Sequence, residues 1–290
     1  MHRVHNVLPM RWFLTLAILL FLYSSAVGQT SVPLTTSRYI YWTNYKTGAV
    51  GRATVTGTSP NESFIKTGVA GGAGLTATSQ FLYWTSANGG TATTILRANL
   101  NGTGLNKKFI TGASNPCGIT HDSTYIYWGG DVGTTIGRAK LDGSDVDHNF
   151  IATGTGVCGV AVTSTHIYWA NYRTGKIGRA NLNGSSPNLS FIPTVGAGSL
   201  SIQGSFIYWP SNSGTTIGRA NLNATGVNQN FIKGLSGVAF IATDSTYIYW
   251  GTGETGTTIG RAKLDGTDVN KSLIKGTLGS FGIAVTAGSP

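Results

Sequence analysis

A stretch of apolar and aromatic residues that ends in Tyr-Trp recurs six times along the 290-residue chain. The pairs are Tyr41-Trp42, Tyr83-Trp84, Tyr127-Trp128, Tyr168-Trp169, Tyr208-Trp209 and Tyr249-Trp250. Successive tryptophans lie 42, 44, 41, 40 and 41 positions apart. Each pair is followed by an Arg-Ala, which begins at Arg52, Arg97, Arg138, Arg179, Arg219 or Arg261. A period of about forty residues is typical of a protein built from repeated supersecondary units.

The fourth unit indicates which elements each repeat contains. Short β-prone segments at 159–162, 166–169, 176–182 and 189–192 are separated by turn-forming residues. The Tyr-Trp segment carries large groups on both of its sides, whereas a strand with one solvated face alternates apolar and polar residues. We therefore expect both faces of this strand to be buried between neighbouring units. Six such units predict an all-β, six-bladed β-propeller.

The first unit lacks the first strand that the other five contain. Nine residues before each Trp there is an apolar residue in units two to six, but Pro33 in the first unit. The missing segment occurs at the other end of the chain, as Gly282-Ile283-Ala284-Val285. We expect this C-terminal strand to pair with the N-terminal blade that begins at Tyr39, which closes the ring and leaves no open sheet edge. An open solenoid of the same units is the alternative.

Composition favours the same fold class and adds an expected location. The chain has 42 Gly and only 10% charged residues, which is typical of short strands and tight turns. Residues 1–28 have the basic start, the 12-residue apolar run and the small residues of a cleaved export signal. That run is shorter than the roughly 20 residues that span a bilayer. We expect a signal peptide at 1–28, a lead-in at 29–38 and the propeller at 39–290, in a secreted or periplasmic monomer without a membrane span.

The positive charge is spread around the repeat. The formal charge of +10 includes Arg3 and Arg11, so the chain without its signal carries +8. Six of its basic residues occupy the repeated Arg position and are distributed over the six units. Because a nucleic-acid site clusters its cations on one face, no nucleic-acid partner is expected. Sixfold repetition favours a structural role for these arginines, such as packing on the aromatic rings of each blade.

The repeated residues resemble a known family. Tyr41-Trp42-Thr43-Asn44, followed by Gly51-Arg52-Ala53, resembles the YWTD (low-density-lipoprotein-receptor class B) repeat, and 177–184 is similar to its third strand and turn. The resemblance covers residues 39–290 and implies a six-bladed propeller. The aspartate of the family motif is replaced by Asn44, Ser86, Gly130, Asn171, Ser211 and Thr252. The third-strand pattern also resembles streptogramin-lyase-like propellers.

Neither catalytic nor metal-binding residues stand out. A lyase of the streptogramin type implies a His-centred site with a divalent metal near the axis. His121, His148 and His166 fall in different parts of two units, and only His121 is expected near the channel. The aspartates with the spacing of Ca²⁺ ligands are Asp142, Asp145, Asp147, Asp265 and Asp268. Equivalent positions in other units hold ordinary hairpin residues, so we predict no metal and no cofactor.

Two cysteines occupy the same position of adjacent units. Cys117 and Cys158 are 41 residues apart. An exported chain permits a disulfide, which requires Cα atoms within about 7 Å. The other units hold Ala73, Gly198, Ala239 and Phe281 at this position, and two small buried thiols are the alternative to a bridge.

The loops between the second and third strands vary while the strands do not. Units one and four carry Asn44-Tyr45-Lys46 and Asn171-Tyr172-Arg173, which a ring of six places on opposite sides of the axis. An exposed Tyr beside a cation is a reasonable recognition pair, although duplicated units can also match by descent. We expect Tyr45, Lys46, Tyr172 and Arg173 to lie exposed on one loop face.

Two functions follow as hypotheses. The first is an exported, non-enzymatic propeller that binds a protein, peptide or glycan through its loop face. The alternative is a propeller enzyme, a metal-assisted lyase or hydrolase with its site near the central channel.

Overall fold

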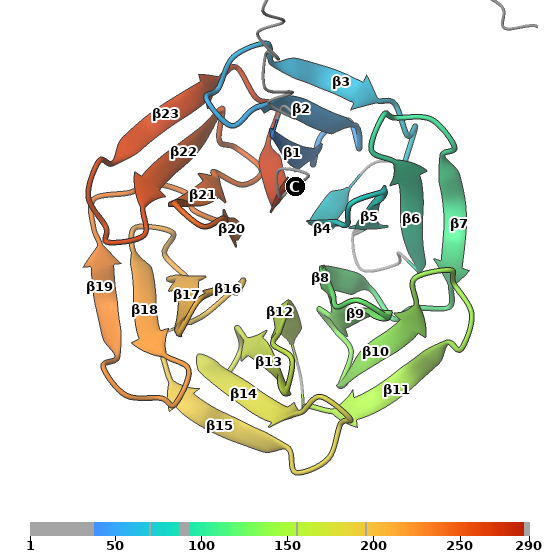
Figure 1. Ribbon diagram of the computed structural model, residues 1–290, viewed down its shortest axis with the longest axis vertical. Helices are drawn as coiled ribbons and strands as arrows, with labels where there is room; N and C mark the ends of the chain where they lie inside the picture. The colour runs from blue at the N-terminus through green and yellow to red at the C-terminus, as the bar shows by residue number, and fades with distance from the viewer. Residues whose placement is uncertain (1–37, 70, 87–92, 155, 195, 287–290) are drawn as a thin grey trace, which may run out of the picture. The chain divides into compact units, whose positions relative to one another are not determined.

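The chain folds into six four-stranded antiparallel sheets arranged around an axis (Figure 1). The computed structural model describes residues 38–69, 71–86, 93–154, 156–194 and 196–286. The expected signal peptide and most of the lead-in lie outside these ranges. The prediction of an all-β, six-bladed β-propeller is confirmed. In the same ranges, no helix has the length and apolar character needed to cross a membrane.

The strands of each blade run outward from the axis in the following order. Blade 1 contains β24 (Ser280–Val285), β1 (Tyr39–Asn44), β2 (Val50–Thr54) and β3 (Asn61–Ile65). Blade 2 contains β4 (Gly72–Ala77), β5 (Phe81–Ser86), β6 (Thr94–Asn99) and β7 (Asn106–Thr111). Blade 3 contains β8 (Pro116–His121), β9 (Tyr125–Gly130), β10 (Thr135–Lys140) and β11 (Asp147–Ala152).

The second half of the ring repeats this order. Blade 4 contains β12 (Val157–Val162), β13 (His166–Asn171), β14 (Lys176–Asn181) and β15 (Asn188–Pro193). Blade 5 contains β16 (Ser201–Gln203), β17 (Phe206–Pro210), β18 (Ile217–Asn221) and β19 (Asn228–Ile232). Blade 6 contains β20 (Ile241–Thr243), β21 (Tyr247–Gly251), β22 (Thr258–Lys263) and β23 (Asn270–Lys275).

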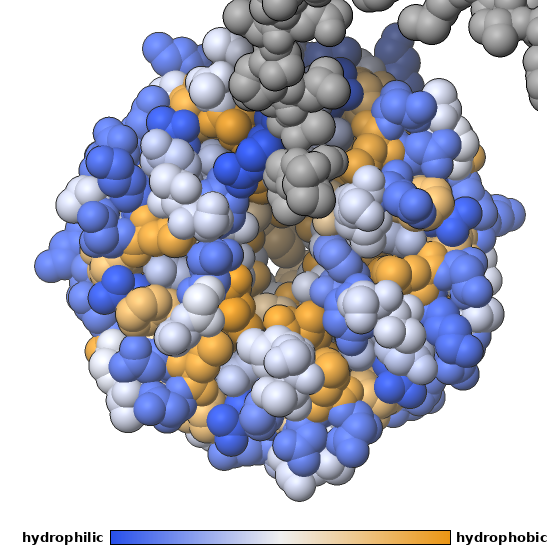
Figure 2. Space-filling view, in the orientation of Figure 1, coloured by the Kyte–Doolittle hydropathy of each residue, from blue (hydrophilic) through white to orange (hydrophobic). Residues whose placement is uncertain are grey.

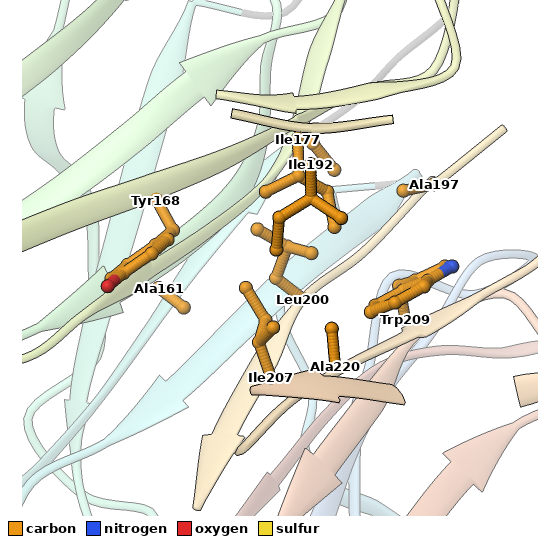
Figure 3. Packing of buried hydrophobic residues seen from close by; sticks show 10 residues of the cluster. Ala161, Tyr168, Ile177, Ile192, Ala197, Leu200, Ile207, Trp209 and Ala220 are labelled. Atoms are coloured by element: carbon orange, nitrogen blue, oxygen red, sulfur yellow. The ribbon is translucent and has the colours of Figure 1, made fainter. Parts of the chain in front are cut away.

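The core lies between adjacent blades. Strand β13 is buried at every residue after His166 because blades 3 and 5 cover its two faces. Figure 3 shows one such interface, where Tyr168 and Ile177 of blade 4 face Trp209 of blade 5. Each pair of neighbouring blades shares a cluster of this kind. This two-sided burial explains why the Tyr-Trp strands do not alternate with polar residues.

The two ends of the chain close the ring within blade 1. Strand β24 pairs with β1, with Trp42 opposite Ile283 and Ile40 opposite Val285. Beyond the strand, the backbone N–H of Thr286 donates to the Tyr39 carbonyl at 3.0 Å. The expected closure by the C-terminal strand is confirmed, and β1 has a partner on both edges.

The repeated arginines pack against aromatic rings of their own blades. Each guanidinium carbon lies 3.8–4.6 Å from the centre of one or two rings. Arg219, for example, lies 4.5 Å from the Phe206 ring and 4.0 Å from the Phe231 ring. The half-buried cation thus bridges the second and fourth strands of the blade, which is a structural role.

We expect Arg219→Leu to lower the free energy of unfolding by about 1–2 kcal/mol, since leucine fills space between the rings without the cation. Urea unfolding followed by tryptophan fluorescence measures this loss. Lys66→Met removes the same charge from an exposed site and serves as the control, with an expected change within about 0.5 kcal/mol. Equal losses in the two variants would contradict the stacking role.

Candidate functional site

A cavity of about 590 Å³ opens at the axis on the face formed by two kinds of loop. One kind joins the second and third strands of a blade, and the other joins neighbouring blades. Backbone hydrogen bonds link the two kinds, as from Tyr45 N to the Gly279 carbonyl at 2.9 Å and from Tyr172 N to the Gly156 carbonyl at 3.2 Å. We call this face the loop face and the cavity the mouth cavity.

Two positions of the repeat supply most of its lining. The first position lies at or just before the start of each innermost strand and holds Ala73, Cys117, Cys158, Gly198, Ala239 and Phe281. The second lies three residues after the Trp, where Tyr45, Asp131, Tyr172 and Asn212 all reach the cavity. Because five of the six residues at the first position are small, space remains at the axis.

The innermost strands approach one another closely below this cavity. A Cβ on Gly118 would collide with the Cys158 carbonyl, and one on Gly282 would collide with the Ala73 carbonyl. Glycine is required at such a position because the neighbouring backbone occupies the space of a side chain. Blades 5 and 6 depart from this pattern with Ser199 and Phe240, and Phe240 lines both the mouth cavity and a second cavity further along the axis.

A disulfide joins blades 3 and 4 at the edge of the mouth cavity. The structure bonds Cys117 to Cys158, with Cα atoms 4.9 Å apart. Their strands, β8 and β12, are neighbours around the axis (Figure 1). The close approach of the innermost strands therefore brings together two residues that are 41 positions apart in sequence.

One side of the mouth cavity is polar. The Tyr172 hydroxyl donates to Asp131 Oδ1, and Asn115 Nδ2 lies 3.4 Å from Asp131 Oδ2. Asn212 Nδ2 donates to the Tyr172 carbonyl at 3.4 Å. Asn115 is only 5% exposed and adopts a φ of 44°, a left-handed conformation that asparagine tolerates. These hydrogen bonds thus join loops of three consecutive blades near the Asp131 carboxylate.

The charge of this carboxylate has no neighbouring counter-ion. Across the described ranges, the ion pairs are Arg38–Asp244 and Lys140–Asp145, so no basic side chain lies within 4.0 Å of Asp131. Burial raises the pKa of Tyr172, and the hydrogen bond to Asp131 raises that pKa further. The tyrosine therefore keeps its proton at neutral pH and remains the donor to Asp131.

The opposite side of the mouth cavity is aromatic. The Phe281 ring centre lies 5.5 Å from that of Tyr45 and 5.2 Å from that of Phe240. These separations are typical of packed aromatic pairs. The three rings come from blades 1 and 6, and the polar group comes from blades 3, 4 and 5. The cavity therefore presents apolar area and hydrogen-bonding groups to the same occupant.

The four predicted binding residues divide into two classes. Tyr45 and Tyr172 are half-buried and line the cavity from opposite blades. Lys46 and Arg173 are exposed and do not line it, and the Arg173 guanidinium carbon lies 5.4 Å from the Tyr172 ring centre. The structure thus brings the two tyrosines to one cavity and leaves the two cations outside its lining.

The predicted site omitted Asp131, Asn115, Phe240 and Phe281. The first of these carried a signal, because Asp131 occupies the same repeat position as Tyr45 and Tyr172. Comparing that single position across all units would have identified it. Phe281 shares a position with the two cysteines, where it is the only large residue.

The histidines do not converge on a site. His121 lines the second cavity, of about 200 Å³, and its Nδ1 lies 2.8 Å from Thr76 Oγ1. Burial lowers the pKa of His121. His148 packs against Trp128, and His166 packs against Tyr168 in another blade.

The opening of the ring at its axis is visible in Figure 2, where hydrophobic residues border it.

Side chains able to hold a metal ion are not grouped in the described part of the chain, where no three His, Cys, Asp or Glu residues come together. Asp142 Oδ1 accepts hydrogen bonds from the Ser144 N–H and hydroxyl, and Asp265 does the same with Thr267. These hydrogen bonds lower the pKa of both carboxyl groups. Asp142 and Asp265, two of the aspartates considered as Ca²⁺ ligands, are therefore turn residues here.

Comparison with known proteins identifies the fold. No protein-family model and no curated protein match the sequence. The propeller in the crystal structure of a nidogen/laminin complex is similar, with a TM-score of 0.71 and 16% identity over 87% of this chain and 100% of that one. A gluconolactonase from Xanthomonas campestris is similar with a TM-score of 0.58 and 13% identity, over 72% of this chain and 77% of that one. The chain is a six-bladed β-propeller whose fold resembles that of the YWTD propellers.

Proposed function

We propose that the chain is an exported, non-enzymatic binding propeller that recognises a protein, peptide or glycan through the mouth cavity. The observation that carries the proposal is that Tyr45 and Tyr172, from opposite blades, line one cavity together with Asp131. Its volume of about 590 Å³ falls within the range of ligand pockets, which combine an apolar lining with a few polar groups.

The nidogen/laminin complex supports a binding role through its fold alone, since the similar propeller belongs to a protein in complex with another. The sequence of residues 1–28 supports export, and a disulfide persists in oxidising compartments. We therefore propose that the protein functions outside the cell or in the periplasm, and we further propose that it is a monomer.

A metal-assisted hydrolase or lyase is the second candidate, because the gluconolactonase has a similar fold. His121 in the second cavity is the residue on which such a site would depend. Elemental analysis of protein purified without chelators tests this candidate: one divalent ion per chain would favour the enzyme over the binding propeller.

We expect the double change Tyr45→Ala and Tyr172→Ala to leave the propeller folded and to weaken ligand capture at least tenfold. Neither ring belongs to the clusters between blades, and an aromatic residue at the centre of a binding site contributes about 1–2 kcal/mol or more. Capture is measured by immobilising the protein and quantifying components retained from the native envelope or secretome.

The matched control removes two exposed apolar side chains from the outer edge of the ring, as Val146→Ala with Leu189→Ala. This control should retain the same components as the unaltered chain. Unchanged capture by the tyrosine variant would refute the site. Loss of folding in that variant would instead show that the two tyrosines stabilise the propeller.

A further inference from the structure

One side of the mouth cavity is aromatic and the opposite side is polar, which restricts the ligands that can bind there. We infer, resting on the proposed binding function, that it takes an uncharged sugar ring of a glycan. One face of the sugar packs on Tyr45 and Phe281, and its hydroxyls face Asp131 and Asn212.

The aromatic side fits the apolar face of a sugar. The rings of Tyr45 and Phe281 are both half-buried, so part of their area is open to an occupant. Phe240 is 8% exposed and packs against Phe281, which helps to hold the Phe281 ring in place. A pyranose carries C–H groups on one face and removes aromatic area from water when it lies on such a ring.

The polar side offers both donors and acceptors. An ionised carboxylate has about four acceptor positions, of which Asp131 uses one for Tyr172 and one for Asn115. Asn212 is exposed and supplies an amide that both donates and accepts. The Ser211 and Ser213 hydroxyls, 3.1 Å apart, lie in the same loop and also line the cavity. Neighbouring hydroxyls of a sugar need this mixture, because each one both donates and accepts.

The carboxylate in the cavity disfavours an anionic ligand. An anion in the cavity would meet the Asp131 carboxylate, which has no cation within 4.0 Å. Lys46 and Arg173 are exposed and lie outside the lining, so solvent screens their attraction for an anion. A neutral ligand does not experience the repulsion that an anion would meet at Asp131.

Two microarrays test the inference with defined probes. One carries neutral glycans that end in glucose, galactose, mannose or N-acetylglucosamine, beside sialylated and sulfated glycans. The other carries acidic and basic peptides. We expect binding to at least one neutral glycan and at least tenfold weaker binding to its sialylated or sulfated form. Competition by the free methyl glycoside of the terminal sugar distinguishes recognition of one ring from recognition of a longer chain.

Variants connect the binding to the cavity. Asp131→Asn and Phe281→Leu should each weaken neutral-glycan binding at least tenfold, measured by titration calorimetry with the glycan found on the array. Asp142→Asn is the matched control, because the equivalent hairpin of blade 4 already holds Asn183. If Phe281→Leu fails to fold, the exposed Asn212→Ala replaces it, with the same expectation.

The outcomes separate this inference from the function on which it rests. Peptide binding that is lost in the Tyr45 and Tyr172 double variant would overturn the sugar ligand and keep the binding propeller. The absence of any neutral-glycan signal, or neutral-glycan binding that Asp131→Asn leaves unchanged, would also overturn the inference.

Discussion

A chain that ends at Gly276 is expected to lose cooperative folding. Strand β24 is missing from that variant, so β1 keeps β2 but loses its partner on the axis side, and that edge of blade 1 opens. Ile283 and Ala284 are 4% and 5% exposed and belong to two different clusters between blades. Burial of one large apolar side chain contributes about 1.5–3 kcal/mol, and a domain is stable by only about 5–15 kcal/mol. Loss of a whole inner strand therefore removes a large part of the total stability.

The control for this truncation is a chain that ends at Thr286. This control keeps β24 and the hydrogen bond from Thr286 N to the Tyr39 carbonyl. Thermal unfolding followed by near-ultraviolet circular dichroism should give the control the same melting temperature as the full chain. The shorter variant should have no near-ultraviolet signal or a melting temperature lower by more than 10 °C. A shorter variant that melts like the control would refute ring closure by β24.

The architecture could be predicted because one pattern is repeated six times. A single unit with its Tyr-Trp strand is ambiguous, since a short apolar run is compatible with several folds. Repetition at a nearly constant spacing removes that ambiguity, and the unit that lacks its first strand indicates how the ends meet. The role of the repeated arginines was also inferred correctly, since a ligand site rarely recurs at every unit while a packing contact does.

The mouth cavity could be predicted only in part, because it is assembled from side chains of all six blades. Tyr45 and Tyr172 were found because their loops carry the same local motif. Asp131 has no such motif around it, and Phe281 reaches the cavity only because β24 closes the ring. The two cations were included because they are adjacent to the tyrosines in sequence. In a loop, consecutive side chains point in different directions, so adjacency in sequence did not place Lys46 and Arg173 in the lining.

Replacing both cysteines by alanine is expected to lower the free energy of unfolding by about 2–4 kcal/mol. The bond between Cys117 and Cys158 closes a loop of 41 residues, which restricts the unfolded chain far more than the folded one. Alanine should be accommodated in the folded state, because Ala73 and Ala239 occupy the same repeat position in other blades. The loss should therefore come from the unfolded state and not from a cavity in the core.

Urea unfolding distinguishes the bond from the packing of the two sulfur atoms. Reduced wild-type protein should unfold at the urea concentration of the double variant, and reductant should not shift the double variant. The free energy of unfolding should also depend more steeply on urea concentration without the disulfide, because an unfolded chain without the cross-link exposes more surface. A variant as stable as the oxidised protein would contradict this account, and so would two reactive thiols in denatured, unreduced protein. If reduction alone has a smaller effect than the double change, the difference measures what the side chains contribute by packing between blades 3 and 4.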